Sequence, residues 1–260
     1  MRLFKALMVL ASLVVAATQA QAAQCGNDGG GFEAWKSAFA PEAKAAGIGS
    51  LGLAALASTH YATKTIYADR HQKSFHLGLD AFMSLRGAAA IVSRGRALKA
   101  QNAALFASIE QRYGVPPGPV IAIWGMETGF GAVTGNQNTI SAVASLAYDC
   151  RRHDYFTEQF LAALKLVDKG VLSSTSIGAM HGEVGQTQFM PQNIFAYGVG
   201  GSLTVKENAL ASTANFLKGH GWKRGAGYQP GETNFAAIQE WNAASVYEQA
   251  LAIIGKKIDE

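Results

Sequence analysis

The sequence predicts a mainly α-helical protein with one domain. Apolar residues recur three and four positions apart in several long segments, whereas the alternation typical of strands is scarce. Of the 260 residues, 49% are hydrophobic and 15% are charged, a composition that excludes a disordered tail, a coiled coil and a collagen-like repeat. Because no repeat, low-complexity linker or domain boundary is evident, we expect a single domain over residues 23–260.

The first 22 residues have the pattern of a secretory signal peptide. Residues 1–5 carry two basic side chains, residues 6–17 are apolar, and residues 20–22 read Ala-Gln-Ala, the small-x-small form of a cleavage site. The alternative is a retained N-terminal anchor, but the apolar run is too short for a membrane span. Removing residues 1–22 reduces the net charge from +4 to +2, so the charge balance does not indicate nucleic acid as a partner.

Two helices are predicted in the first half of the chain from their apolar spacing. Phe32, Trp35 and Phe39 form one stripe of a helix that we expect to stop near Pro41. A second helix is expected over residues 96–113, because its apolar positions share one face.

The second half of the chain carries clearer helix boundaries. A helix is expected over residues 154–169, where Gly170 provides the stop. Residues 204–207 read Thr-Val-Lys-Glu, a capping box that predicts a helix as far as Lys218. A second box, Ser-Val-Tyr-Glu at residues 245–248, falls within an apparent C-terminal helix and so predicts two helices that meet near residues 241–242.

The two cysteines, Cys25 and Cys150, suit an exported protein. A bridge between them would close a long loop in an oxidising compartment. The alternative is that Cys25, beside the cleavage site and a glycine-rich run, is too mobile to pair. The sequence leaves both possibilities open.

Several classes of chemistry lack their motifs. The six histidines form no His-Glu-x-x-His pattern and no Cys/His cluster, so we expect no metal site. Gly-x-Ser-x-Gly, the P-loop and a Gly-x-Gly-x-x-Gly turn after a strand are also missing. We therefore expect no cofactor, and neither nucleotide nor serine-hydrolase chemistry.

One carboxylate stands out at the end of an apolar segment. Residues 120–126 read Val-Ile-Ala-Ile-Trp-Gly-Met and predict a buried helix, with Glu127 in its last turn beside Trp124 and Phe130. Burial disfavours the charged form and raises the pKa of a glutamate, which suits a general acid near neutral pH. The alternative is a carboxylate that reaches solvent or a backbone N–H.

A second candidate segment is residues 185–191, which read Gly-Gln-Thr-Gln-Phe-Met-Pro. Its amides and hydroxyl, together with Asn193, offer neutral donors and acceptors beside apolar contacts, a surface that suits N-acetylated sugars. The alternative is an ordinary helix start.

Together these segments resemble the lytic murein transglycosylase B family, the soluble lytic transglycosylases of glycoside hydrolase family 103. The matching motifs are Arg-Gly-Arg-Ala-Leu at 94–98, Tyr-Gly-Val-Pro-Pro at 113–117, Ile-Trp-Gly-Met-Glu-Thr-Gly-Phe-Gly at 123–131, the 185–191 segment, Phe-Leu-Lys-Gly-His-Gly-Trp at 216–222, and the stretch from Glu-Trp-Asn at 240–242 to Tyr247. Several motifs in the right order make the resemblance specific.

The resemblance implies a lysozyme-like fold with a groove for the glycan strands of peptidoglycan, in the periplasm. The implied reaction cleaves the β-1,4 bond between N-acetylmuramic acid and N-acetylglucosamine without water, giving 1,6-anhydromuramyl products, with Glu127 as acid and then base. Partners in cell-wall assembly or secretion machinery are also conceivable. The family's substrate-binding positions correspond to Gln188, Arg151, Arg152, Tyr155, Trp241, Asn242 and Tyr247.

The chain departs from the family pattern in three places. Where many relatives read Gly-Ala-Met-Gly-Gln, residues 182–186 read Gly-Glu-Val-Gly-Gln; we expect Glu183 to be solvent-exposed, although it could be a second carboxylate at the groove. Residues 197–208, where some relatives bind calcium, contain Glu207 as their only acid, so we expect no calcium site. We also expect no added peptidoglycan-binding domain.

Two rival functions remain at this stage. A hydrolytic muramidase would use Glu183 to activate water and would release reducing ends. A non-catalytic peptidoglycan-binding or scaffold protein would keep the groove without turnover, although a pure binder has no need for a desolvated acid.

Overall fold

A computed structural model describes residues 23–71 and 77–260, so the predicted signal peptide lies outside the described residues. The described chain is mainly helical, as predicted. Its helices are α1 (Phe32–Ala45), α2 (Ser50–Ser58), α3 (Thr63–Arg70), α4 (Leu79–Leu85), α5 (Ala88–Gln101), α6 (Ala103–Tyr113), α7 (Pro117–Thr128), α8 (Thr139–Tyr148), α9 (His153–Asp168), α10 (Pro191–Tyr197), α11 (Lys206–Gly219), α12 (Phe235–Trp241) and α13 (Ser245–Asp259). A 3-10 turn, η1 (Gly29–Gly31), precedes α1.

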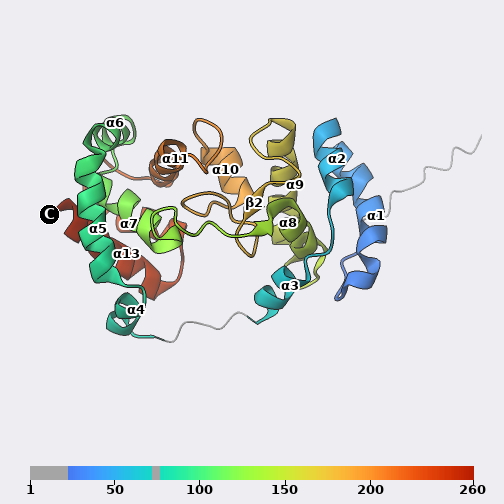
Figure 1. Cartoon of the computed structure of the whole chain (residues 1–260), viewed down its shortest axis with the longest axis horizontal. Coiled ribbons are helices and arrows are strands. Elements are labelled where there is room, and N and C mark those ends of the chain that lie inside the picture. Colours follow the sequence, from blue (N-terminus) through green and yellow to red (C-terminus); the bar gives the residue numbers. More distant parts are fainter. Residues whose placement is uncertain (1–22, 72–76) are drawn as a thin grey trace, which may run out of the picture.

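The helices gather toward the two ends of the long axis (Figure 1). α4, α5, α6, α7 and α13 lie toward one end, and α1, α2, α3, α8 and α9 lie toward the other, with α10 and α11 between them. α7 packs against α5 and α13, while α9 packs against α2, α8 and α10. Two short strands, β1 (Gln137–Asn138) and β2 (Ile177–Gly178), form an antiparallel pair that joins the start of α8 to the loop before α10.

α7 is the buried helix that the apolar run predicts. It begins with proline at its first position and ends at Gly129, which adopts the left-handed conformation with a φ of 58°. Its residues 118–126 are all buried. The helix approaches α13 closely, because a Cβ on Gly118 would lie 2.2 Å from the carbonyl oxygen of Gly255.

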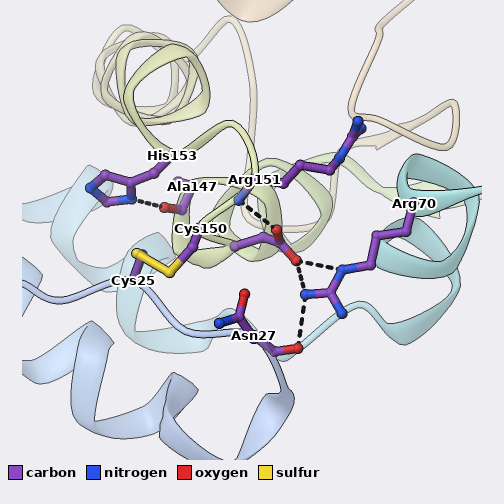
Figure 2. The surroundings of a disulfide bond; sticks show 8 residues. Cys25, Asn27, Arg70, Ala147, Cys150, Arg151 and His153 are labelled. Carbon is purple, nitrogen blue, oxygen red and sulfur yellow. Dashed lines mark hydrogen bonds and ion pairs between the residues drawn. A yellow bond between two sulfur atoms is a disulfide. The ribbon is translucent and has the colours of Figure 1, made fainter.

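Cys25 and Cys150 form a disulfide, which settles the question that the sequence left open. Their Cα atoms lie 5.0 Å apart across 125 residues of chain. Figure 2 shows the bond where the N-terminal segment meets the residues that follow α8. In the same region the Arg70 guanidinium donates to the Asn27 carbonyl at 2.8 Å and to Asp149.

Two predicted helix boundaries are wrong. α1 does not stop at Pro41 but runs on to Ala45, and its apolar stripe continues through the fully buried Ala43. Burial of that stripe therefore outweighs the hydrogen bond that proline removes. The predicted helix over residues 96–113 is two helices, because the chain breaks at Asn102, whose φ and ψ are −117° and 32°.

Neither predicted capping box forms, although both helices exist near the expected positions. Val205 caps α11, while the Thr204 hydroxyl pairs with that of Ser202 at 2.8 Å. Ala244 caps α13, so Ser245 is already helical. The prediction that two helices meet near residues 241–242 is confirmed by α12 and α13, and α9 matches its predicted bounds to within one residue.

Candidate active site

Glu127 lies in the last turn of α7, where the apolar run ends. Past the helix the chain turns away sharply through Gly129, Phe130 and Gly131, all three with positive φ. The φ of 80° at Gly131 favours glycine, because other residues are strained in this region, and a Cβ there would also displace the Gln186 amide that lies 2.5 Å away. The turn leaves Glu127 at the edge of the core and directs the following residues away from its carboxyl group.

Two donors from the C-terminal helices meet one oxygen of this carboxyl group. The Trp241 indole Nε1, at the end of α12, donates to Glu127 Oε1 at 3.1 Å. The Tyr247 hydroxyl, in the first turn of α13, donates to the same oxygen. Tyr247 is 4% exposed, so it contacts Glu127 from within the core.

Burial controls the protonation of this group, as the sequence predicts. Desolvation raises the pKa of Glu127 above its usual value, and it outweighs the opposite effects of the Tyr247 and Trp241 hydrogen bonds and of the Arg86 charge. Burial and the neighbouring Glu127 also hold the pKa of Tyr247 well above its usual value, so this hydroxyl remains a donor. The site thus presents a carboxylic acid that retains its proton at a higher pH than an exposed glutamate does.

A cavity of about 220 Å³ opens beside Glu127. Its lining combines polar and aromatic side chains and consists of Glu127, Glu183, Gln188, Phe189, Met190, Asn193, Phe216, Trp241 and Asn242. Four predicted site residues, Glu127, Gln188, Trp241 and Asn242, therefore come together here. Larger hollows occur elsewhere on the described surface, but they do not contain this carboxyl group.

Glu183 also lines this cavity, and the prediction that it is solvent-exposed is wrong: its side chain is 25% exposed. The backbone N–H of His181 donates to Glu183 Oε2 at 2.9 Å, and the His181 ring Nδ1 lies 3.3 Å from Oε1. Although burial alone raises the pKa of Glu183, these interactions with His181 reverse the effect and hold it below its usual value.

The 185–191 segment forms a tight turn that leads into a helix, since Met190 caps α10 and Pro191 is its first residue. Val184 and Phe189 pair across the turn, while Gln188 adopts a left-handed φ of 57° and donates through its amide to the Gly185 carbonyl at 2.8 Å. Gln186 accepts a hydrogen bond from the Trp124 indole at 3.0 Å. These contacts fix the turn against α7 and place Gln188 beside Glu127.

The three predicted site residues after Cys150 lie at the start of α9. Arg151 and Arg152 both pair with the buried Asp69, so we call these three residues the Asp69 cluster. Burial raises the pKa of Asp69, but the hydrogen bonds from the two arginines outweigh burial and hold it below its usual value. Tyr155 is 49% exposed and lies within electrostatic range of Glu183. The cavity lining includes neither arginine and does not include Tyr155.

Over the ranges 23–71 and 77–260, no group of three or more His, Cys, Asp or Glu side chains lies close enough to hold a metal ion. A search of the same residues for a helix long and apolar enough to cross a membrane found none.

A family comparison identifies the chain. The family described as the transglycosylase SLT domain matches residues 31–233. The chain belongs to this family. Membrane-bound lytic murein transglycosylase B of Escherichia coli K12 is 35% identical over 125 residues, which are 44% of this chain and 34% of the relative. This SLT-domain protein therefore matches about a third of the length of that relative.

Solved structures agree with this assignment. SltB3 from Pseudomonas aeruginosa, solved in complex with NAG-anhNAM-pentapeptide, is 29% identical with a TM-score of 0.77, covering 86% of this chain and 78% of SltB3. SltB1 from the same organism is 21% identical with the same TM-score, covering 86% and 97%, a likeness of fold alone. The predicted family and the mainly helical, lysozyme-like fold are confirmed for this SLT-domain protein.

Three residues at or near the site escaped the sequence reasoning. Arg86, just past α4, lies within electrostatic range of Glu127 and Tyr247. His181 holds Glu183, and Asp69 holds the two arginines. No motif marks any of them, because each meets its partner through the tertiary fold or within a turn.

Proposed function

We propose that this protein is a periplasmic lytic transglycosylase that cleaves the β-1,4 bond between N-acetylmuramic acid and N-acetylglucosamine in peptidoglycan. The products would be 1,6-anhydromuramyl ends, formed without addition of water. The observation that carries the proposal is the buried carboxyl group of Glu127, held by Trp241 and Tyr247 at a polar cavity. Membership of the SLT-domain family supports the same activity.

The reaction needs one group that first gives and then takes a proton. Protonated Glu127 donates to the glycosidic oxygen as its bond to the muramyl C1 breaks, and the leaving sugar departs with a new hydroxyl. The muramyl O6 hydroxyl then bonds to C1 and returns its proton to Glu127. Atoms and charge balance without water, and the internal nucleophile benefits from a high effective concentration.

The two donors fit this cycle. Because Tyr247 and Trp241 both donate to Oε1, the transferable proton belongs on Oε2 of Glu127. Both donors stabilise the carboxylate once the proton has left, while burial destabilises it before substrate binds. The N-acetyl group of the muramyl sugar would stabilise the positive charge between the two steps, which removes the need for a second carboxylate.

Substrate binding is proposed for the polar lining of the cavity. Gln188 and Asn242 offer amides to the N-acetyl and hydroxyl groups of the sugars, and Trp241 offers an aromatic surface. Tyr155, which lies within electrostatic range of Arg152 and Glu183, is proposed together with Arg151 and Arg152 to contact the glycan strand beyond the cavity lining. The complex of SltB3 with a peptidoglycan fragment supports a glycan-strand ligand for this chain as well.

Export completes the proposal. Residues 1–22 are proposed to be a signal peptide and residues 23–260 the catalytic domain. The disulfide between Cys25 and Cys150 supports an oxidising compartment such as the periplasm. Association with cell-wall assembly or secretion machinery remains a prediction.

The test is a digest of isolated sacculi with the mature protein and with Glu127→Gln, followed by mass spectrometry of the soluble muropeptides. We expect products one water lighter than those of a lysozyme digest, and none from Glu127→Gln, while both proteins still co-sediment with sacculi. Reducing-end products would indicate a hydrolytic muramidase. Binding without products from either protein would indicate a non-catalytic scaffold.

A further inference from the structure

Two acidic side chains line the cavity, and the proposed reaction uses only one of them. The second, Glu183, has a side chain that is three-quarters buried and that contacts His181. Both of its carboxylate oxygens are engaged, Oε2 by the His181 backbone N–H and Oε1 by the His181 ring. A carboxylate that is partly buried and fixed through both oxygens needs a reason to be there, because burial of a charge costs free energy.

We propose that Glu183 is a positioning residue for Glu127, a fixed negative charge in the same cavity that keeps Glu127 protonated until it meets the glycosidic oxygen. The inference rests on the proposed function and deepens it. Glu183 is the acidic residue by which residues 182–186 depart from the family pattern, and the proposal gives this departure an electrostatic function. Glu183 acts through Glu127 and transfers no proton itself.

The charges around both groups favour this arrangement. Arg86, Trp241 and Tyr247 stabilise the ionised form of Glu127, and the negative charge of Glu183 opposes them, as burial does. Like charges in one cavity resist simultaneous ionisation, so the carboxyl group whose donors outweigh its burial ionises first.

Glu183 is the group that ionises. Its donors come from His181, in the same turn. These contacts hold the pKa of Glu183 below its usual value, whereas that of Glu127 is raised. Two carboxyl groups whose environments push their pKa values apart are the arrangement that allows one to remain an acid.

The contacts with His181 also weaken Glu183 as a base for water. Each carboxylate oxygen keeps a lone pair beside its His181 contact. These contacts nevertheless hold the pKa of Glu183 below its usual value, which lowers its affinity for a proton taken from water. The surroundings of Glu183 therefore suit a fixed negative charge better than a general base.

The experiment compares Glu183→Gln with wild type by the pH dependence of kcat/KM for muropeptide release. A general acid must be protonated, so activity falls as the pH rises through the pKa of Glu127. Removing the negative charge lets Glu127 ionise more readily, and we expect the alkaline limb to move to lower pH by about half a unit to one unit. Glu183→Ala, which removes the charge without adding an amide, should move the limb in the same direction.

A matched control is Glu207→Gln, which removes the same charge from an exposed side chain outside the cavity and should leave the limb in place. A second readout needs no turnover: the ¹³C carboxyl resonance of Glu127, assigned by its loss in Glu127→Gln, is titrated in wild type and Glu183→Gln. We expect its midpoint to fall by the same amount.

An unchanged or higher midpoint for Glu127 in Glu183→Gln overturns the inference. The inference is also overturned if the wild type releases reducing-end products and Glu183→Gln does not. That result would show that Glu183 activates water as a general base. If wild type releases no muropeptides at all, the proposed function fails, and the carboxyl titration still decides whether Glu183 controls Glu127.

Discussion

Replacing Tyr247 with phenylalanine removes one hydroxyl from a buried site and changes little else. That hydroxyl donates to Glu127 Oε1 and remains protonated, since burial raises the pKa of Tyr247. A hydrogen bond to a charged group contributes about 1.5–3 kcal/mol, and one pKa unit corresponds to about 1.4 kcal/mol. Losing this donor destabilises the carboxylate form more than the protonated acid, so the pKa of Glu127 should rise further, by about one unit and at most about two.

The assay is again the pH dependence of kcat/KM for muropeptide release. In Tyr247→Phe the alkaline limb should move to higher pH, opposite to the shift expected for Glu183→Gln. Tyr113→Phe is the matched control, because Tyr113 is 7% exposed and its hydroxyl has no hydrogen-bond partner among the described residues. A limb that stays in place, or moves to lower pH, would show that Tyr247 does not stabilise the ionised form of Glu127.

Three further predictions concern stability and use thermal unfolding of the mature protein. Cys25→Ala opens a loop of 125 residues, which in the chain-entropy model costs about 5 kcal/mol and lowers the Tm by roughly 10–20 °C; a Tm equal to that of oxidised wild type would contradict this. Asp69→Asn should cost about 2 kcal/mol at neutral pH, less than a fully buried pair because the guanidinium groups are a third or more exposed. Because the pKa of Asp69 is lowered in the folded state, the wild type itself loses this stabilisation as the pH falls below about 4. The wild type and Asp69→Asn should therefore become equally stable at low pH, and a difference in Tm that persists at pH 2 would show that ionised Asp69 is not the source of the stabilisation. Gly118→Ala places a Cβ against the Gly255 carbonyl and should cost about 1–3 kcal/mol, whereas Gly78→Ala, with open space around it, should leave the Tm within 2 °C of wild type or raise it slightly.

The central part of the site was predictable because its signal is local. An unbroken apolar run that ends in a carboxylate and two glycines encodes α7, the burial of Glu127 and the turn beyond it in a dozen consecutive residues. The raised pKa follows from the same residues, since desolvation is its largest cause. Local pattern also located α9 and the separation of α12 from α13.

The errors arose where tertiary contacts decide. The apolar spacing of residues 96–113 continues across Asn102, yet the chain breaks there, and the Asn102 side chain bonds both the Leu98 carbonyl and the Lys206 ammonium. Pro41 should stop a helix, but burial of Ala43 beyond it carries α1 onward. The sequence predicts Glu183 at the surface, whereas the structure places it in a cavity that residues of α7 and α12 also line. The residues next to Glu183 in the chain give no sign of this cavity, because its other walls come from distant segments.

The hydrogen bonds to Glu127 come from residues 114 and 120 positions later in the chain, beyond the region that the family match covers. A polypeptide released early by a ribosome, or clipped after residue 233, would retain Glu127 but neither of its donors. It would also lack α13, the principal packing partner of α7. The final segment thus acts as a completeness requirement: a shortened chain keeps the acid and loses both the groups that set its protonation and the helix that supports it.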